Sequence, residues 1–426
     1  MRIAVVGSGI AGLASAWLLS RRHEVVLYEA QDRLGGHTHT HDIRLGSRRY
    51  RVDTGFIVMN RQHYPLLSAL FAELGVATQP TTMSFSVRNE RSGLEYNAST
   101  LRGLFCQRRN LASPRFLGMV RDILRFYRQA GALLAQPGPG PSLRDYLDGN
   151  GYGEAFRDDH LVPMAAALWS SPSDAVLGFP ARFLVQFMAN HQMLQVAGRP
   201  QWQTVVGGSS AYVDALRARW PVQVRLADPV RRVERLAGAG VRVLSLQGED
   251  RFDQVVLACH SDQALALVDR PTPAEGQVLG AIGFQANDTV LHTDASVLPR
   301  RGRAWAAWNA LVPAQPGEQC TVSYLMNQLQ SLDAPTPLVV SLNQTERIDA
   351  DRILARMTYH HPLYTQGAVA AQGRRAEIDG VDRLWYAGAW WGWGFHEDGI
   401  RSAVDIARAL DVDWPAAASA GDPGDH

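Results

Sequence analysis

Residues 2–29 read RIAVVGSGIAGLASAWLLSRRHEVVLYE, and this stretch decides the fold. The apolar run at 3–6 is typical of a buried parallel strand, and the apolar residues at 13–19 are typical of a helix. Between them stand Gly7, Gly9 and Gly12 in the pattern GxGxxG, and a second apolar run ends at Glu29. This order of strand, glycine turn, helix, strand and acid predicts a Rossmann-like unit that binds a dinucleotide.

Each glycine of this turn has its own structural role. Gly7 permits the tight turn, Gly9 lets the backbone approach a pyrophosphate, and Gly12 lets the helix pack closely against the strand. Free N–H groups at the helix N-terminus meet the phosphate charge, and Glu29 is placed to accept hydrogen bonds from a ribose. The predicted contacts of the turn are Gly7, Ser8, Gly9, Ile10, Ala11 and Gly12.

The segment after Glu29 carries a more specific motif. It reads EAQDRLGGHTHT, with Arg33 followed by the pair Gly35 and Gly36. Here the chain resembles the superfamily of flavin-containing amine oxidoreductases, which includes monoamine oxidases, protoporphyrinogen oxidases and phytoene desaturases. His37 stands where that family usually has a second arginine. The resemblance implies bound FAD, with Arg33 beside the pyrophosphate. The contacts it implies here and in DTGF at 53–56 are Ala30, Arg33, Gly35, Gly36, His37, Thr38, Gly55 and Phe56.

The C-terminal segment 383–410, RLWYAGAWWGWGFHEDGIRSAVDIARAL, carries the second family motif. WYAG matches a strand that ends near the flavin, and DGIRSA matches the start of a last helix aimed at the flavin pyrimidine. Asp398 replaces a glycine there, and its carboxylate is expected to cap the helix. The cofactor contacts implied toward this end of the chain are Val230, Gly388, Ala389, Asp398, Gly399 and Ile400. No cysteine lies near the AG motif, so we expect non-covalent FAD.

These motifs predict an α/β fold with two domains. The first is a Rossmann-like FAD-binding domain of the glutathione-reductase type, assigned to 1–75, 205–270 and 381–413. The second is a discontinuous α+β substrate domain, assigned to 76–204 and 271–380. Residues 414–426 are rich in Ala, Gly, Pro and Asp and are expected to form a disordered tail.

The C-terminal motif also predicts an apolar active site. Trp385 and Phe395 stand where monoamine oxidases have the two tyrosines that face the flavin. Three more aromatic residues crowd the same loop: Trp390, Trp391 and Trp393. We therefore expect FAD to take a hydride from a C–H bond of an apolar lipid or isoprenoid substrate. His396, beside Glu397, is the candidate catalytic base nearest in sequence.

All 42 basic residues are arginine, and the chain contains no lysine. Many family amine oxidases hold a water at the flavin with a lysine, and the comparable strand here offers Asp288 or Thr289. Amine oxidation of that style is disfavoured. The alternatives are an amine oxidase with a different active site, a flavin-dependent isomerase without net redox change, and a flavin-stabilised partner subunit without turnover. The chain also resembles flavoproteins associated with cyclopropane fatty-acid synthases, which favours a lipid substrate.

Neither the histidines nor the cysteines predict a metal site. The alternating residues of HTHTHD are His37, His39 and His41. No carboxylate or cysteine cluster completes a metal shell around them, so we expect them to line the path of the cofactor. The cysteines lack CxxC spacing and are expected to be reduced; they are Cys106, Cys259 and Cys320.

The segment from Arg102 to Arg128 is strongly basic, with seven arginines against one acid, Asp122. Ser113 and the proline after it are expected to open an amphipathic helix that runs to about Gln129. Such a helix can lie on an anionic membrane; the alternative is a helix packed on its own domain with a solvated arginine face. The sequence shows no secretory signal or membrane span. We expect a cytoplasmic protein with this segment as its candidate for peripheral membrane contact, and a net charge of +1 predicts no nucleic-acid partner.

Overall fold

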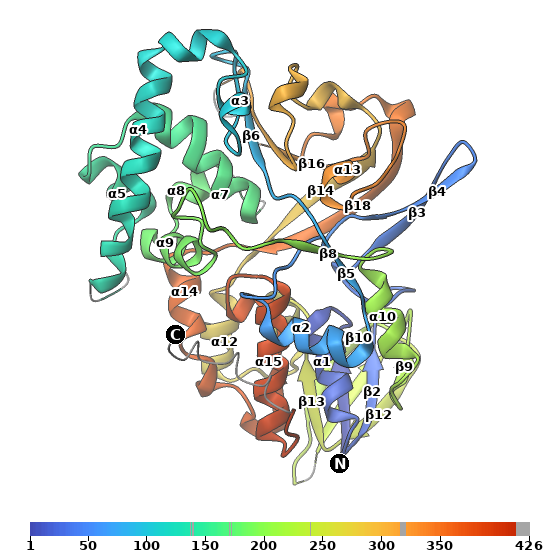
Figure 1. Cartoon of the computed structure of the whole chain (residues 1–426). Coiled ribbons are helices and arrows are strands. Elements are labelled where there is room, and N and C mark those ends of the chain that lie inside the picture. The colour runs from blue at the N-terminus through green and yellow to red at the C-terminus, as the bar shows by residue number, and fades with distance from the viewer. Residues whose placement is uncertain are drawn as a thin grey trace, which may run out of the picture.

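Two sheets organise the chain in the computed structural model, which describes residues 1–136, 138, 140–169, 171, 173–238, 240–315 and 321–414 (Figure 1). A five-stranded sheet has the order β19 (Leu384–Tyr386), β13 (Gln254–Leu257), β1 (Arg2–Val6), β2 (Glu24–Tyr28), β9 (Gln223–Arg225). A seven-stranded sheet has the order β18 (Ile353–Pro362), β14 (Phe284–His292), β17 (Val339–Leu342), β16 (Thr321–Leu325), β15 (Trp308–Val312), β6 (Phe85–Asn89), β7 (Leu94–Asn97). Two pairs join them: β3 (Thr40–Leu45) with β4 (Arg48–Asp53), and β5 (Thr78–Pro80) with β8 (Gln203–Val205).

The five-stranded sheet is parallel throughout and is buried on both faces. This burial explains why its strands read as continuous apolar runs. Successive residues of β1 pack into two different cores, Ile3 and Val5 into one and Ala4 and Val6 into the other. The first core is closed by α1 (Ile10–Leu19), α2 (Pro65–Leu74), α10 (Ser210–Arg217) and α15 (His396–Ala409).

The other face of this sheet is covered by a three-stranded sheet and by three helices. The strands are β10 (Val230–Arg235), β11 (Val241–Ser245) and β12 (Glu249–Phe252); the helices are α11 (Ser261–Leu267), α12 (Pro273–Gly280) and α14 (Gln366–Gln372). Val278 of α12 and Ala368 of α14 share a core with Leu257 of β13. Both helices fall in the range 271–380 that the sequence assigned to the substrate domain. That boundary was wrong, because these helices bury their apolar faces on the FAD-type sheet.

The seven-stranded sheet belongs to the upper half of the molecule, with a group of helices at its side (Figure 1). Every neighbouring pair is antiparallel except β15 with β6. The helices are α3 (Leu101–Leu104), α4 (Pro114–Gln129), α5 (Leu143–Gly149), α6 (Glu154–Phe156), α7 (Val162–Trp169), α8 (Ser173–Leu177) and α9 (Ala181–Asn190), and α13 (Met326–Leu329) follows β16. Most of them share one core that includes Phe126, Phe156 and Phe179.

The sequence signals at the ends of two helices are confirmed by their caps. Ser113 accepts a hydrogen bond from the N–H of Phe116 and opens α4 at Pro114. Gly75 ends α2 in the left-handed region, with φ of 69°. One end was misplaced: Trp414, assigned to a disordered tail, is buried and donates its indole N–H to Glu73 (3.0 Å). The remaining tail residues, 415–426, lie outside the described residues.

Candidate functional site

One cavity of about 1400 Å³ runs from the glycine turn to the seven-stranded sheet. Ligand pockets commonly measure about 300–1,000 Å³, so this one has room for a cofactor and a second molecule. Most of the predicted contacts line it: Gly7, Ser8, Gly9, Ile10, Ala11, Glu29, Ala30, Arg33, Gly35, Gly36, His37, Gly55, Phe56, Val230, Gly388, Ala389, Phe395 and His396. Six do not line it: Gly12, Thr38, Trp385, Asp398, Gly399 and Ile400.

The glycine turn has the shape that its sequence predicts. A Cβ on Gly12 would lie 1.9 Å from the carbonyl oxygen of Gly7, so only glycine lets α1 pack this closely. Gly7 itself has φ of 102°, in the left-handed region. A Cβ on Gly9, by contrast, meets no described atom within 4 Å. The space beside Gly9 therefore opens into the cavity at the N-terminus of α1, where a pyrophosphate would be held by free N–H groups.

Glu29 ends β2 beside the same turn. Its carboxylate accepts hydrogen bonds from the N–H of Ser8 (2.9 Å) and the hydroxyl of Ser8 (2.5 Å). The N–H of Gln31 donates to its other oxygen (2.8 Å). These bonds fix the acid at the cavity wall, where Oε1 keeps a further lone pair for a ribose hydroxyl. Val230, at the start of β10, lines the same end of the cavity.

Arg33 lines the cavity next to the glycine pair. Its guanidinium donates to the carbonyl oxygens of Thr38 (3.3 Å) and Gly36 (2.8 Å). No carboxylate among the described residues pairs with it. A Cβ on Gly36 would lie 3.0 Å from the Cα of Gly9, so the two glycine segments are in close contact. An arginine without an acidic partner beside a helix N-terminus suits the two negative charges of a pyrophosphate.

The DTGF segment brings the chain close to this site. A Cβ on Gly55 would lie 2.1 Å from the carbonyl oxygen of His37, which leaves no room for a larger residue. Asp53 is fully buried and accepts hydrogen bonds from Thr40, Ser209 and Gln330. Burial raises the pKa of Asp53 to about 6, against the opposing effect of these bonds. The hydrogen bonds of Asp53 therefore anchor this segment and fix Gly55 beside the cavity.

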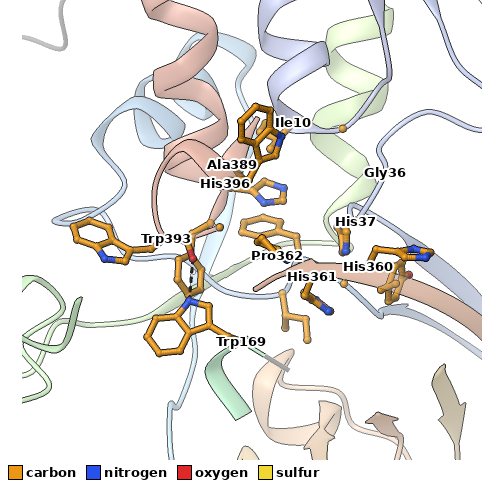
Figure 2. A pocket seen from close by; sticks show the side chains of 18 of the residues that line it. Ile10, Gly36, His37, Trp169, His360, His361, Pro362, Ala389, Trp393 and His396 are labelled. Atoms are coloured by element: carbon orange, nitrogen blue, oxygen red, sulfur yellow. Dashed lines mark hydrogen bonds between the residues drawn. The ribbon is translucent and has the colours of Figure 1, made fainter. Parts of the chain in front are cut away.

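Four histidines from three segments face the same space (Figure 2). Figure 2 shows His37, His360, His361 and His396 around it. The His37 ring stacks on Tyr359, with centroids 4.9 Å apart, and lies 5.2 Å from His361. His361 is fixed by the side-chain amide of Asn287 (2.9 Å). In all, eight of the thirteen histidines line the cavity.

Three of these imidazoles, those of His37, His361 and His396, are held neutral. Burial lowers the pKa of His361 to about 4 and that of His396 to about 3. Burial also lowers the pKa of His37 well below its ordinary value, and the ring's Nε2 has no hydrogen-bond partner among the described residues. A buried polar atom without a partner indicates that a ligand meets it. This observation, the open space at Gly9 and the unpaired Arg33 all fit a bound flavin dinucleotide.

The segment 359–362 was not predicted from the sequence. Tyr359, His360, His361 and Pro362 line the cavity from the end of β18, together with Phe284 from the start of β14. The repeated histidines before a proline were the available signal. The histidine at 260 adds to this wall, since its ring stacks on Phe284 at 4.2 Å.

His396 opens α15 at the cavity wall. Its ring stacks on Phe56 with centroids 3.7 Å apart, and its Nε2 is hydrogen-bonded to the hydroxyls of Thr38 (3.0 Å) and Tyr212 (3.3 Å). The cofactor contact of Thr38 stays a prediction: Thr38 does not line the cavity, and its side chain lies behind His396. Thr38 fixes the orientation of the imidazole.

The first turn of α15 is occupied by caps. Asp398 accepts hydrogen bonds from the N–H groups of Trp393 (3.0 Å) and Phe395 (3.1 Å), which confirms the predicted cap. Glu397 is buried and accepts from the N–H groups of Leu66 and Leu67, capping α2. It is therefore not available as a base.

Asp398, Gly399 and Ile400 were predicted to contact the cofactor, but they do not line the cavity. A Cβ on Gly399 would lie 2.8 Å from the side chain of Ile10, so this glycine serves the crossing of α15 with α1. Ile400 is fully buried in the same core. The cavity is reached one turn earlier in the chain, by Phe395 and His396.

Trp385, predicted as catalytic, is also placed elsewhere. It lies within β19 and donates its indole N–H to the side chain of Gln254 in β13 (2.9 Å). Trp390 and Trp391 form a structural pair with ring centroids 4.2 Å apart. Their indole N–H groups donate to backbone carbonyls of Cys259 and Tyr386.

The half of the cavity beyond the histidines is aromatic. Phe395 stacks on Phe187 with centroids 5.2 Å apart, and Trp169 donates to the carbonyl of Trp393 (3.0 Å; Figure 2). Further apolar or aromatic lining residues are Met83, Phe85, Met164, Leu168, Met193, Trp202, Trp308 and Tyr324. Asp288 and Thr289, offered as substitutes for the family lysine, do not line the cavity, because their hydroxyl and carboxyl groups bond within β14 and to Thr345.

No group of three or more potential metal ligands comes together in the described part of the chain. His37 and His39 both contact Tyr359 and line the cavity, whereas the ring of His41 packs against that of His39 at 3.9 Å and does not line it. Cys106 and Cys259 are free thiols, and Cys320 lies outside the described residues. No described helix is long and apolar enough to cross a membrane.

The sequence has relatives that carry the same motifs. The sequence model of the flavin-containing amine oxidoreductases matches residues 10–290. The chain is 30% identical over 291 residues to AofH of Mycobacterium tuberculosis, which is named as a flavin-containing monoamine oxidase; the match covers 65% of this chain and 61% of that protein. It is 26% identical over 323 residues to the carotenoid phi-ring synthase of Streptomyces griseus, covering 70% and 59%. The chain thus spans about three fifths of the length of these curated relatives.

Solved structures share the architecture over nearly the whole chain. The cyclohexylamine oxidase of Brevibacterium oxydans matches with a TM-score of 0.69 and 16% identity, covering 96% of this chain and 99% of that one. The fatty acid isomerase of P. acnes matches with a TM-score of 0.67 and 16% identity, covering 96% and 98%. At this identity the likeness shows the fold alone.

Proposed function

The chain belongs to the flavin-containing amine oxidoreductase family and is an FAD-dependent oxidoreductase, and from this premise we propose that it removes a hydride from a C–H bond of an apolar, lipid-like substrate. The observation that carries the proposal is the aromatic and aliphatic half of the cavity. It lies beyond the histidine wall, which is formed by His37, His360, His361 and His396. Bound FAD would supply the hydride acceptor, and release of a proton from the neighbouring carbon would complete a carbon–carbon double bond. We further propose that the protein works in the cytoplasm.

The charges around the cavity favour this substrate over an amine. An ammonium group is usually met by a carboxylate or by an aromatic cage. The carboxylate that lines the described cavity is Glu29, and it lies at the dinucleotide end beside Ser8. The substrate half offers aromatic faces, which also attract an ammonium group, but no anion within the described ranges. It is therefore the lack of a carboxylate in the described part of this half that disfavours an amine.

The residues at the histidine wall have definable tasks in such a reaction. Phe395 and Trp393 exclude water from the reacting C–H bond, which prevents side reactions of a reduced flavin. The neutral His396, with its Nε2 engaged by Thr38, supports Phe56 and keeps a positive charge away from the site. We assign His396 the role of a positioning residue rather than that of a base.

Anaerobic mixing tests the proposed reaction. The holoprotein is mixed with oleate, with squalene and with benzylamine, and the flavin absorbance is followed. Bleaching by oleate or squalene is the expected result, since a hydride transferred to the flavin reduces it. Bleaching by benzylamine alone would assign an amine oxidase instead. Isomerised oleate without net bleaching, or silence with all three, would also overturn the proposal.

We also propose that one face of the protein rests on an anionic bilayer. The arginine–leucine face consists of Leu101, Leu111, Leu117, Leu124, Arg102, Arg108, Arg121 and Arg128 of α3, α4 and the turn between them. The four leucines are 77%, 59%, 44% and 44% exposed, which is unusual for leucine unless another apolar surface covers it. Among the described ion pairs, the arginines of this face take part in a single one, a long contact of 3.9 Å between Arg121 and Asp122. Basic and apolar groups on one face match an anionic lipid surface.

Vesicle sedimentation tests this contact. The holoprotein is expected to pellet with phosphatidylglycerol vesicles and to stay in solution with phosphatidylcholine vesicles or at high salt. The double change Leu117→Asp and Leu124→Asp is expected to weaken binding at least about tenfold, because it removes apolar burial and adds repulsion. Leu246→Asp is the matched control, since that leucine is 53% exposed on the distant β11–β12 turn. Equal losses from both variants would refute a specific face.

A further inference from the structure

The far end of the cavity carries a cation that the cofactor does not explain. Three charged residues line the described cavity, and two of them, Glu29 and Arg33, belong to the dinucleotide end. The third is Arg199, in the segment between α9 and β8, and it is exposed at the surface. An arginine at the mouth of an aromatic cavity is a recognition group without an assigned partner.

The guanidinium is oriented by two neighbours. Its Nε donates to the carbonyl oxygen of Gln195 (3.0 Å), and its Nη2 donates to the hydroxyl of Tyr127 (3.4 Å). Tyr127 comes from α4 and lines the cavity as well. Across the described ranges no carboxylate pairs with Arg199. The remaining N–H groups and the Tyr127 hydroxyl are therefore donors placed side by side at the mouth.

Uncharged polar side chains such as Thr82, Ser84 and Ser99 also line the cavity, but Arg199 is its charged group away from the dinucleotide end within the described residues. Gln201 also lines the mouth, but its amide N–H groups already donate to the carbonyls of Thr81 (3.0 Å) and Trp202 (2.9 Å). The same cavity is lined by Met193, Trp202 and the Phe187–Phe395 pair. The arrangement offers one charged group at the rim and an apolar path toward the histidine wall.

We propose that Arg199, with the Tyr127 hydroxyl, binds the anionic head group of a long acyl chain whose tail extends along the aromatic wall. Guanidinium groups bind carboxylates and phosphates through paired N–H donors. The head group is either the carboxylate of a free fatty acid or the phosphate of a lysolipid. The inference rests on the proposed function, because it names the class of the apolar substrate.

Binding to the holoprotein tests the head group. Equilibrium dialysis compares oleate, oleoyl lysophosphatidate, oleyl alcohol and oleylamine, which share one chain. A charge-assisted bond is expected to make at least one of the two anions bind about tenfold or more tightly than the alcohol, and the better anion identifies the source. Arg199→Gln is expected to abolish this preference and to leave binding of the alcohol unchanged. Tyr127→Phe is expected to reduce the preference a few-fold.

Arg303→Gln is the matched control, because Arg303 is an exposed arginine on the substrate half, outside the cavity. It should behave as the unmodified protein. Equal binding of anions and alcohol, or an anion preference that survives Arg199→Gln, would overturn the head-group site while leaving an apolar substrate in place. Tighter binding of oleylamine would overturn it as well. If none of the four chains binds to yellow, flavin-loaded protein, the proposed function fails together with this inference.

Discussion

Gly9→Ala is expected to leave the protein folded but colourless, whereas Gly12→Ala is expected to destabilise the fold. The two glycines are three residues apart, yet their surroundings are opposite. A Cβ on Gly9 meets no described atom within 4 Å, and its φ of −63° and ψ of 176° are open to alanine. The new methyl group would occupy the space at the N-terminus of α1 that a pyrophosphate needs. FAD affinity should fall at least about a hundredfold, since steric exclusion and loss of N–H contacts act together.

At Gly12 the Cβ would lie 1.9 Å from the carbonyl oxygen of Gly7, and relief requires α1 to move away from β1. Overpacking of this kind costs about 1–3 kcal/mol or more. The measurements are flavin absorbance after purification, titration of the apoprotein with FAD, and thermal unfolding of the apoprotein. Gly118→Ala in α4 is the control, because its Cβ also meets open space but faces no cofactor. Unchanged FAD affinity in Gly9→Ala would contradict the site.

Features that depend on residues close together in the sequence could be predicted, whereas features that depend on pairing between distant segments could not. The glycine turn, Glu29 and the caps Ser113 and Asp398 depend on residues only a few positions away, and the structure has them as predicted. The histidine wall depends on long-range pairing. His361 reaches the cavity because β18 pairs with β14 in a register that sets it opposite Gln285. No local pattern encodes that register, so this part of the site was missed.

Trp385 shows a different source of error. Family resemblance located it two residues before the AG motif, but strand geometry decides where its side chain points. Within β19 it packs against the core on the α15 side, while its neighbours Leu384 and Tyr386 face the opposite core. Ligands of open parallel sheets bind beyond the carboxyl ends of the strands. Gly388 and Ala389, which follow the strand, therefore line the cavity, and Trp385 does not.

Mild acid is expected to unfold this protein, because several buried histidines are neutral in the folded state. Burial lowers the pKa of His160 and His396 to about 3 and that of His191 and His292 to about 4. In the unfolded chain each titrates near its ordinary value of about 6.5. The folded pKa is depressed, so the stability contributed by the neutral rings is present above about pH 6.5 and is lost as the pH falls toward 4.

The size of the effect follows from proton uptake on unfolding. Each of the four histidines binds close to one proton more in the unfolded chain at pH 5.5, and together they reduce the free energy of unfolding by about 5 kcal/mol between pH 7 and pH 5.5. This loss equals a large part of the stability of an ordinary domain, roughly 5–15 kcal/mol. Urea unfolding of the holoprotein with excess FAD at the two pH values measures it. His292→Gln changes a residue of β14 away from the cavity, removes one titrating group and should reduce the loss of unfolding free energy between the two pH values by about 1 kcal/mol. The proposal would be contradicted by a free energy of unfolding that is equal at the two pH values, or by a pH dependence that His292→Gln leaves unchanged. Either result would show that the folded protein takes up protons at these rings as readily as the unfolded chain.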